Sequence, residues 1–180
     1  MQKASWKKTV ALAALFGALY ALINRSAIGV AGLLRITGGA SILDFEFGYG
    51  YEKAYGMLLA LGPEGRAFYL TRILPLDFLF PISYMLSYAS LIALLAKYAN
   101  PPKPCRYLLL VPVLAMLCDW AENIGAVAML NGYPGLPRWA VPLASISGML
   151  KTASNVGCLA AIAGLSILFA LSKLRKARTA

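Results

Sequence analysis

The sequence predicts an all-α membrane protein, a bundle of four transmembrane helices with one short helix at the outer interface. Two observations carry this prediction. The 180-residue chain is 60% hydrophobic but only 13% charged, with a mean hydropathy of +0.69, whereas soluble domains average about half apolar and about a quarter charged residues. Its apolar residues also gather in four stretches, each long enough for a helix to cross a bilayer. This composition excludes a soluble enzyme and a disordered chain.

The four apolar stretches define the predicted spans of a single membrane domain, residues 1–180. The spans cover residues 9–34, 68–95, 107–130 and 141–171. The first is the weakest, because Arg25 and its polar neighbours interrupt it, and with the lysines before it the first half also fits a signal peptide. We expect it to be retained as a span. In the second span, Pro75 and Pro81 predict a kink that frees backbone carbonyls.

The orientation follows from the positive charges, which lie mostly at the ends of the apolar stretches. The N-terminus, the second loop and the C-terminal tail carry lysines and arginines without acids: Lys3, Lys7, Lys8, Lys97, Lys103, Arg106, Lys173, Arg175, Lys176 and Arg178. Positive loops stay in the cytoplasm, so both termini are predicted there, in a plasma membrane protein. A nucleic-acid binder would instead gather its net charge of +10 on one patch. We therefore expect membrane lipids, and no nucleic acid, as partners.

The first outer loop, residues 35–66, is the largest segment outside the predicted spans. Tyr51, Tyr55 and Leu58 follow a helical i, i+4, i+7 spacing, which predicts a short helix with tyrosines at headgroup depth. Gly62 is expected to end this helix and Pro63 to start the next. A cap packed on the end of the bundle is the alternative that the sequence leaves open.

Small residues recur every four positions in the first and fourth spans. They are Ala13, Gly17 and Ala21 in the first span, and Ala153, Gly157 and Ala161 in the fourth. Such spacing lets helix backbones approach closely in lipid. We expect these spans to pack against each other or against a second copy, so a homo-oligomer or a larger membrane complex is a possible assembly.

Several kinds of chemistry have no residues to support them. The chain has no histidine, which removes His-based zinc, haem and triad chemistry. Cys105, Cys118 and Cys158 form no C-x-x-C pair, and no glycine-rich phosphate loop is present. We therefore predict no metal and no cofactor. Carboxylates, lysine, arginine, amides and tyrosines remain.

Ionisable groups inside three spans predict a polar pocket. At a helix rise of about 1.5 Å per residue from the inner positive flanks, Asp77, Asp119, Glu122 and Lys151 all fall in the outer half of the bilayer. Charges at such depth are costly, face the bundle interior and mark functional sites. If the three polar faces meet, Lys151 pairs with one carboxylate. At least one other acid is then left to bind a proton or a cation.

Helical spacing adds further candidates, because residues three or four apart share a face. The predicted pocket residues are Asp77, Asp119, Glu122, Asn123, Lys151, Asn155, Tyr84 and Arg66. The alternative is structural: Asp77 and Lys151 would be interfacial residues in water, and Asp119, Asn123 and Asn155 would be hydrogen-bond links between helices.

Short motifs across residues 50–155 resemble a family of small four-span bacterial membrane proteins that is uncharacterised. The motifs are Leu61-Gly62-Pro63-Glu64-Gly65-Arg66, Tyr69, Leu76-Asp77, Phe80-Pro81, Tyr84, Asp119-x-x-Glu122-Asn123 and Lys151. The resemblance implies a four-helix membrane fold and a shared role for these polar residues. It implies no activity.

The sequence favours a binding role, in which the outward pocket holds a lipid-like or amphiphilic ligand and Asp119 and Glu122 act as counter-charges. One alternative is an integral-membrane enzyme on a lipid-like substrate, with these two acids as acid and base and Lys151 stabilising charge. Another is a structural or accessory subunit of a larger membrane complex. A proton-coupled exporter fits the clustered outer charges less well.

Overall fold

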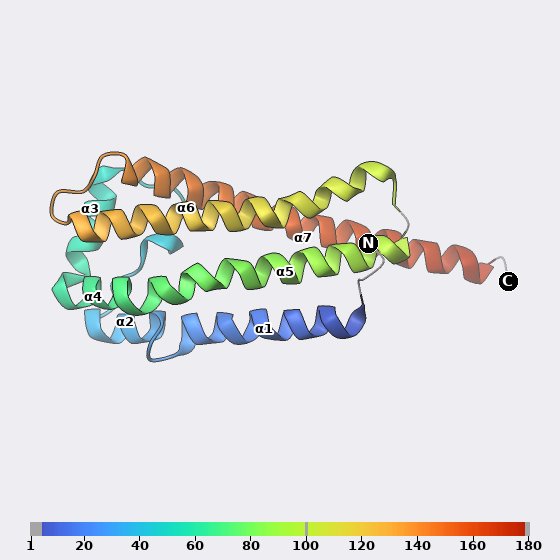
Figure 1. The fold of residues 1–180 in the computed structure, drawn as a ribbon, viewed down its shortest axis with the longest axis horizontal. Helices are drawn as coiled ribbons and strands as arrows, with labels where there is room; N and C mark the ends of the chain where they lie inside the picture. Colours follow the sequence, from blue (N-terminus) through green and yellow to red (C-terminus); the bar gives the residue numbers. More distant parts are fainter. Residues whose placement is uncertain (1–4, 100, 179–180) are drawn as a thin grey trace.

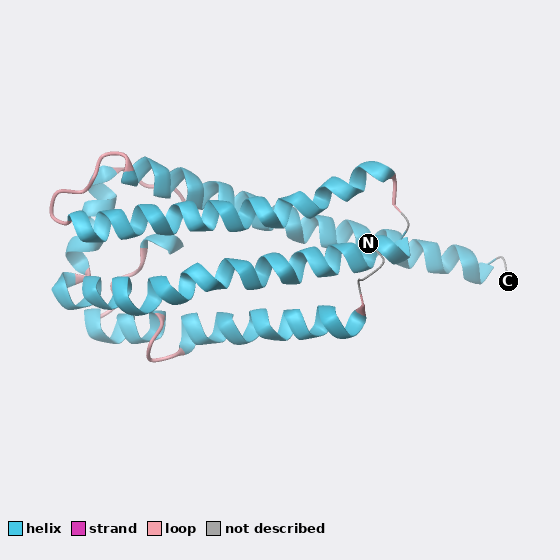
Figure 2. Ribbon diagram, viewed as in Figure 1, coloured by secondary structure: helices cyan, strands magenta, loops and turns pink. Residues whose placement is uncertain are grey.

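The computed structural model describes residues 5–99 and 101–178, and every regular element within them is a helix (Figure 2). Four helical segments are long and apolar enough to cross a membrane: Trp6–Thr37, Gly62–Ala99, Pro104–Gly132 and Ala140–Leu174. The predicted all-α, four-helix membrane fold is therefore confirmed. Helix α1 starts at the end of the bundle where α7 finishes (Figure 1), as four crossings require. Which end faces the cytoplasm stays a prediction.

Some charges used for the predicted orientation cannot be placed. Lys3 lies outside the described residues, and the side chains of Lys103, Arg175, Lys176 and Arg178 lie outside them too. Two basic residues that the structure does describe are Lys97, at the last turn of α5 (Leu74–Ala99), and Lys173, near the end of α7 (Ala140–Arg178). The last turns of α5 and α7 lie at the end of the bundle where α1 begins (Figure 1).

The first span is broken where the sequence predicts an interruption. Helix α1 (Trp6–Arg25) ends before a tight turn, and α2 (Val30–Thr37) continues beyond it. Gly29 lies in this turn, where an added Cβ would come within 1.9 Å of the Ile23 carbonyl oxygen. Only glycine fits this close approach, so the break is built into the sequence.

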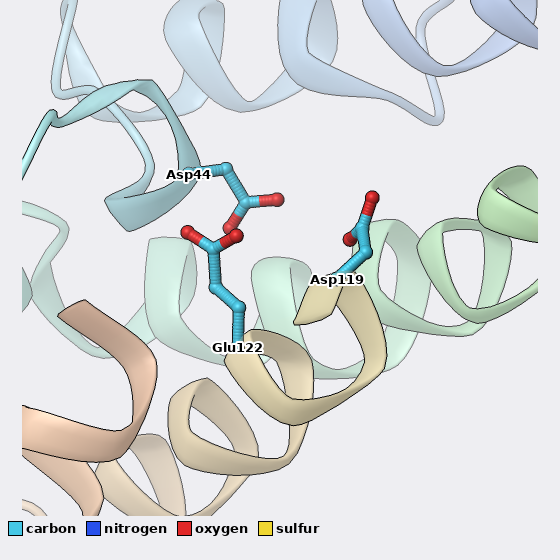
Figure 3. Close-up of side chains that lie close together, drawn as sticks. All are labelled: Asp44, Asp119 and Glu122. Carbon is cyan, nitrogen blue, oxygen red and sulfur yellow. The ribbon is translucent and has the colours of Figure 1, made fainter. Parts of the chain in front are cut away.

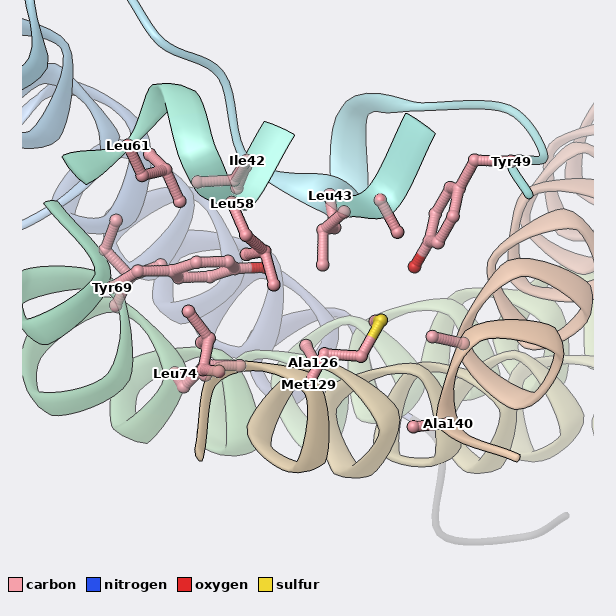
Figure 4. Packing of buried hydrophobic residues seen from close by; sticks show 14 of the residues in the cluster. Ile42, Leu43, Tyr49, Leu58, Leu61, Tyr69, Leu74, Ala126, Met129 and Ala140 are labelled. Carbon is pink, nitrogen blue, oxygen red and sulfur yellow. The ribbon is translucent and has the colours of Figure 1, made fainter. Parts of the chain in front are cut away.

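The outer loop folds as a cap on the end of the bundle. It contains the short 3-10 helix η1 (Leu43–Phe45), α3 (Tyr51–Ala60) and α4 (Gly62–Phe68). Leu43 and Leu58 are fully buried in an apolar cluster with Met129 of α6 (Leu110–Gly132), as Figure 4 shows. The structure thus favours the cap over a helix lying in the interface. As expected, Gly62 lies just after α3, with φ of +63°. Helix α4 begins at Gly62 itself, and Pro63 is its second residue.

Helix α4 runs through a π-helical turn, η2 (Tyr69–Ile73), into α5. Pro81 within α5 has no N–H group, so the Asp77 carbonyl, four residues earlier, loses its usual donor. The side chain of Asn123 donates to the Asp77 carbonyl at 3.1 Å. The indole of Trp120 donates to the Phe78 carbonyl at 2.9 Å. Both donors lie on α6, so the freed Asp77 carbonyl and the neighbouring Phe78 carbonyl link α5 to α6.

This link predicts a specific coupling between Pro81 and Asn123. Asn123→Leu is expected to lower the free energy of unfolding by about 1–3 kcal/mol, because it leaves a buried carbonyl unpaired. In a Pro81→Ala background the loss should shrink, because the new N–H can bond to Asp77 within α5. Asn131→Leu is the control, since exposed Asn131 bonds only within its own helix. Reversible unfolding in detergent measures all variants, and strictly additive losses would contradict the link.

The small residues predicted to pack do not bring α1 and α7 together within one chain. Helix α1 packs mainly against α5, and α7 mainly against α6 and α5. Ala13, Gly17, Ala21 and Ala153 are exposed, and Gly157 and Ala161 are half-buried. Packing against a second copy stays a prediction.

A close contact of small residues lies instead between α6 and α7. An added Cβ at Gly125 would lie 2.7 Å from the Ala144 Cβ and 2.9 Å from the Ala140 carbonyl oxygen. This contact was missed in the sequence because the small partners of Gly125 lie on another helix. The tight contact sets the distance between the two helices that carry most of the polar groups.

Candidate functional site

A cavity of about 310 Å³ lies between α1, η1, α5, α6 and α7. One wall is aromatic. Its rings come from α1 and α5: Phe16, Tyr20, Phe80, Tyr84 and Tyr88. These rings pack against one another; the Phe16 centroid lies 5.6 Å from that of Phe80 and 5.9 Å from that of Tyr88. The wall is therefore a continuous apolar surface.

The cavity is also lined by three carboxyls, which come from three elements. Asp77 lies in the first turn of α5, Asp119 in the middle of α6, and Asp44 in η1. Asp77 and Asp119 are only 7% and 3% exposed. Figure 3 shows the carboxyl groups of Asp44, Asp119 and Glu122 close together. Burial of several like charges is costly unless a cation or protons compensate them.

Lys151 on α7 supplies one positive charge to this cluster. Its Nζ lies 2.5 Å from Glu122 Oε2, 3.7 Å from Asp119 Oδ1 and 3.9 Å from Asp44 Oδ2. The shortest of these ion pairs joins Lys151 to Glu122, which is 1% exposed. One ammonium thus faces four acids, counting Asp77, and it is held closest to the acid that lies behind the cavity.

Two tyrosines donate hydrogen bonds to Asp119 and Asp44. The Tyr84 hydroxyl donates to Asp119 Oδ2 at 3.0 Å, and the Tyr69 hydroxyl donates to Asp44 Oδ1 at 2.9 Å. Three buried oxygens that belong to cavity residues have no hydrogen-bond partner among the described residues: Asp77 Oδ2, Asp119 Oδ1 and Asn155 Oδ1. All three are acceptors, so the cavity is short of donors.

The eight predicted pocket residues separate into three groups. Those that line the cavity are Asp77, Tyr84, Asp119, Lys151 and Asn155. Glu122 and Asn123 lie behind it, the first paired with Lys151 and the second bonded to the α5 backbone. Arg66 is a correction: its guanidinium donates to the Leu58 carbonyl and lies 3.9 Å from the centre of the Tyr133 ring, so it belongs to the cap.

Sequence reasoning missed Asp44, together with Phe16 and Tyr20 of the aromatic wall. Asp44 lies in a loop that carries several other acids. Its position in the sequence, outside the predicted spans, gives no reason to assign it to the pocket. One signal was present. Asp44 stands within the apolar run Ile42-Leu43-Asp44-Phe45, and Ile42 and Leu43 are buried in the cap. An acid inside an apolar run of a polar loop indicates a buried position.

Asp44, Asp119 and Glu122 also resemble a cation site, because each offers an oxygen and these oxygens lie within 4.8 Å of one another. Carboxylate oxygens are the ligands of Mg²⁺ and Ca²⁺. However, the Lys151 ammonium lies between 2.5 and 3.9 Å from oxygens of all three. The Lys151 ammonium therefore occupies the position in which these oxygens would bind a metal ion.

Tyr49, in the cap, lies near the same acids. Its backbone N–H donates to Ser145 Oγ of α7 at 2.8 Å. Burial, and then the nearby carboxyls of Glu122 and Asp44, raise the pKa of the Tyr49 phenol above its ordinary value. The phenol therefore keeps its proton across the physiological pH range and adds no further negative charge to the cluster.

Fold and site together define a class of protein: a small multi-pass membrane protein with an acidic cavity inside its helix bundle. Comparison with known proteins found no matching family model, no matching curated protein and no matching solved structure. The resemblance to a bacterial four-span family therefore stays a prediction.

Proposed function

We propose that the protein binds a single membrane amphiphile in this cavity. The observation that supports it is the pairing of buried carboxyls with an apolar aromatic wall in one cavity. Ligand sites are typically apolar concavities with a few convergent polar groups, and intramembrane charges mark such sites. The polar end of the ligand would lie at Asp77 and Asp119, and its apolar part along the rings of Phe16 and Phe80.

The position of α1 supports entry from the lipid side. This helix supplies Phe16 and Tyr20 to the cavity wall, while much of its remaining surface is exposed. It is held to α5 by the Thr9–Ser90 hydroxyl pair, 2.7 Å apart. An apolar chain that passes beside α1 stays in an apolar medium, so its transfer from the bilayer costs little.

Binding is favoured over catalysis by the place of Glu122. The enzyme hypothesis makes Asp119 and Glu122 an acid/base pair, which requires both to reach the substrate. Glu122 lies behind the cavity and is paired with Lys151. It is therefore placed to neutralise the lysine rather than to exchange protons with a ligand.

The test is native mass spectrometry, with lipid analysis, of protein extracted gently from its own membrane. We expect one enriched amphiphile in the wild type. Asn155→Phe should abolish this enrichment, because Asn155 lines the cavity and a larger side chain fills it. Thr152→Phe on the same helix is the control, since Thr152 is exposed. Equal enrichment in both variants, or no enriched amphiphile in the wild type, would overturn the proposal.

A further inference from the structure

We propose that the polar end of the ligand is a primary ammonium group, so that the cavity takes a long-chain amine. This inference rests on the proposed function and narrows it to one chemical class. It depends on three features of the described residues: the kind of polar atom left without a partner, the balance of charge around the cavity, and the aromatic wall.

The unpartnered atoms of the cavity residues set the hydrogen-bonding chemistry of the ligand. Asp77 Oδ2 and Asp119 Oδ1 belong to side chains that are more than nine-tenths buried, and neither has a hydrogen-bond partner. The amide oxygen of Asn155 is the third such atom. Buried acceptors without donors are destabilising. A primary ammonium carries three N–H donors and no acceptor, which matches three acceptors.

The charge balance around the cavity favours a positive ligand. The carboxyls of Asp44, Asp77 and Asp119 line the cavity, and among the described residues Lys151 is the one cationic residue that lines it. Because Lys151 is held closest to Glu122, at 2.5 Å, most of its charge is already balanced behind the cavity. A cation in the cavity is therefore attracted, whereas a phosphate or sulfate group meets carboxylates and no free cation.

The aromatic wall favours an organic ammonium group over a metal ion as the ligand of the cavity. The rings of Phe16, Phe80, Tyr84 and Tyr88 offer π-faces that attract an ammonium group and apolar surface for its carbon chain. A hard metal ion gains little from such a wall, because it takes oxygen ligands. A quaternary ammonium would use the rings but has no N–H group, so the acceptors of Asp77 and Asp119 would stay unpaired.

The experiment uses the full chain in phosphatidylcholine nanodiscs and four probes: dodecylamine, dodecyltrimethylammonium, dodecanol and dodecyl sulfate. Binding is measured by native mass spectrometry and by ligand-induced thermal stabilisation. We expect dodecylamine to bind about ten-fold tighter, or more, than the other three. Asp77→Asn and Asp119→Asn should weaken dodecylamine by a similar factor. Exposed Glu64→Gln is the matched control for surface charge and should leave binding unchanged.

The outcomes separate this inference from the proposed function. If dodecyltrimethylammonium binds as tightly as dodecylamine, the ammonium need not donate hydrogen bonds and the inference fails. If dodecanol or dodecyl sulfate binds best and Asn155→Phe removes it, the inference also fails while the proposed function stands. If no probe binds and Asn155→Phe leaves the co-purified lipids unchanged, the proposed function itself fails. The probe series on the wild-type chain decides the matter even where a variant does not fold.

A final competition measurement distinguishes two sources of the primary ammonium group, a free long-chain amine and a phospholipid headgroup. Phosphatidylethanolamine carries the same group beside a phosphate, so it is added to the nanodiscs as a competitor. We expect it to displace dodecylamine poorly, because its phosphate would meet Asp44 and Asp77 without a free cation. Displacement at similar concentration would overturn the free-amine form of the proposal.

Discussion

Lys151→Met is expected to lower the free energy of unfolding by about 3–5 kcal/mol, the range found when one partner of a buried ion pair is removed. Without the ammonium, Glu122 and Asp119 lose the cation that lies 2.5 and 3.7 Å from their oxygens. Methionine has a similar length and fills the same space, so the loss reports charge rather than packing. Reversible unfolding in detergent, followed by circular dichroism, measures the change.

A second variant and a control make this result specific. Lys151→Met combined with Glu122→Gln should recover a large part of the lost stability, because it removes the acid left without its partner. Lys173→Met on the same helix should change stability little, since Lys173 is exposed. The electrostatic account of the cluster is wrong if Lys151→Met is as stable as the wild type, or if the double variant is no better than the single one.

Gly125→Leu is expected to destabilise the bundle by about 3 kcal/mol or more, because overpacking a tight contact forces backbones apart. Even a Cβ atom at Gly125 would come within 2.9 Å of the Ala140 carbonyl oxygen, and a backbone atom cannot rotate away. The same change would move α6 relative to α7, and with it Asp119 relative to Lys151. Unfolding in detergent should show the loss directly.

The control for this substitution is Gly17→Leu on α1. Nothing lies within 4 Å of a Cβ at Gly17, so this variant should keep the stability of a single chain. Gly125→Ala should fall between the wild type and Gly125→Leu. Equal stability for Gly125→Leu and Gly17→Leu would show that α6 and α7 do not pack as closely as the structure describes.

Local properties of the sequence were enough to predict the spans and their irregularities. The length of each apolar stretch predicts a helix that crosses the membrane, and four such helices are present. Gly62 and Pro63 mark the boundary between α3 and α4 because their backbone preferences act within a few residues. Pro81 predicts freed carbonyls for the same reason, since the missing N–H lies within the same helix.

The polar residues inside the spans could also be recognised, because a charge in an apolar stretch is costly wherever the helix packs. Five of the eight predicted pocket residues line the cavity. Their partners could not be predicted in the same way. Glu122 and Lys151 lie on different helices, and only the packing of α6 against α7 decides that Lys151 is closer to Glu122 than to Asp119.

What the sequence alone determined is therefore the membrane-spanning helices, their breaks and the set of buried charges, all of which depend on residues near one another in the chain. The tertiary structure decided which faces meet. In this structure Asp44 of the cap lies beside Asp119 and Lys151. Helix α1 packs against α5 rather than α7. Arg66 belongs to the cap and not to the cavity. These outcomes depend on contacts between distant segments, and hydrophobic periodicity carries no information about which distant segment a face will meet.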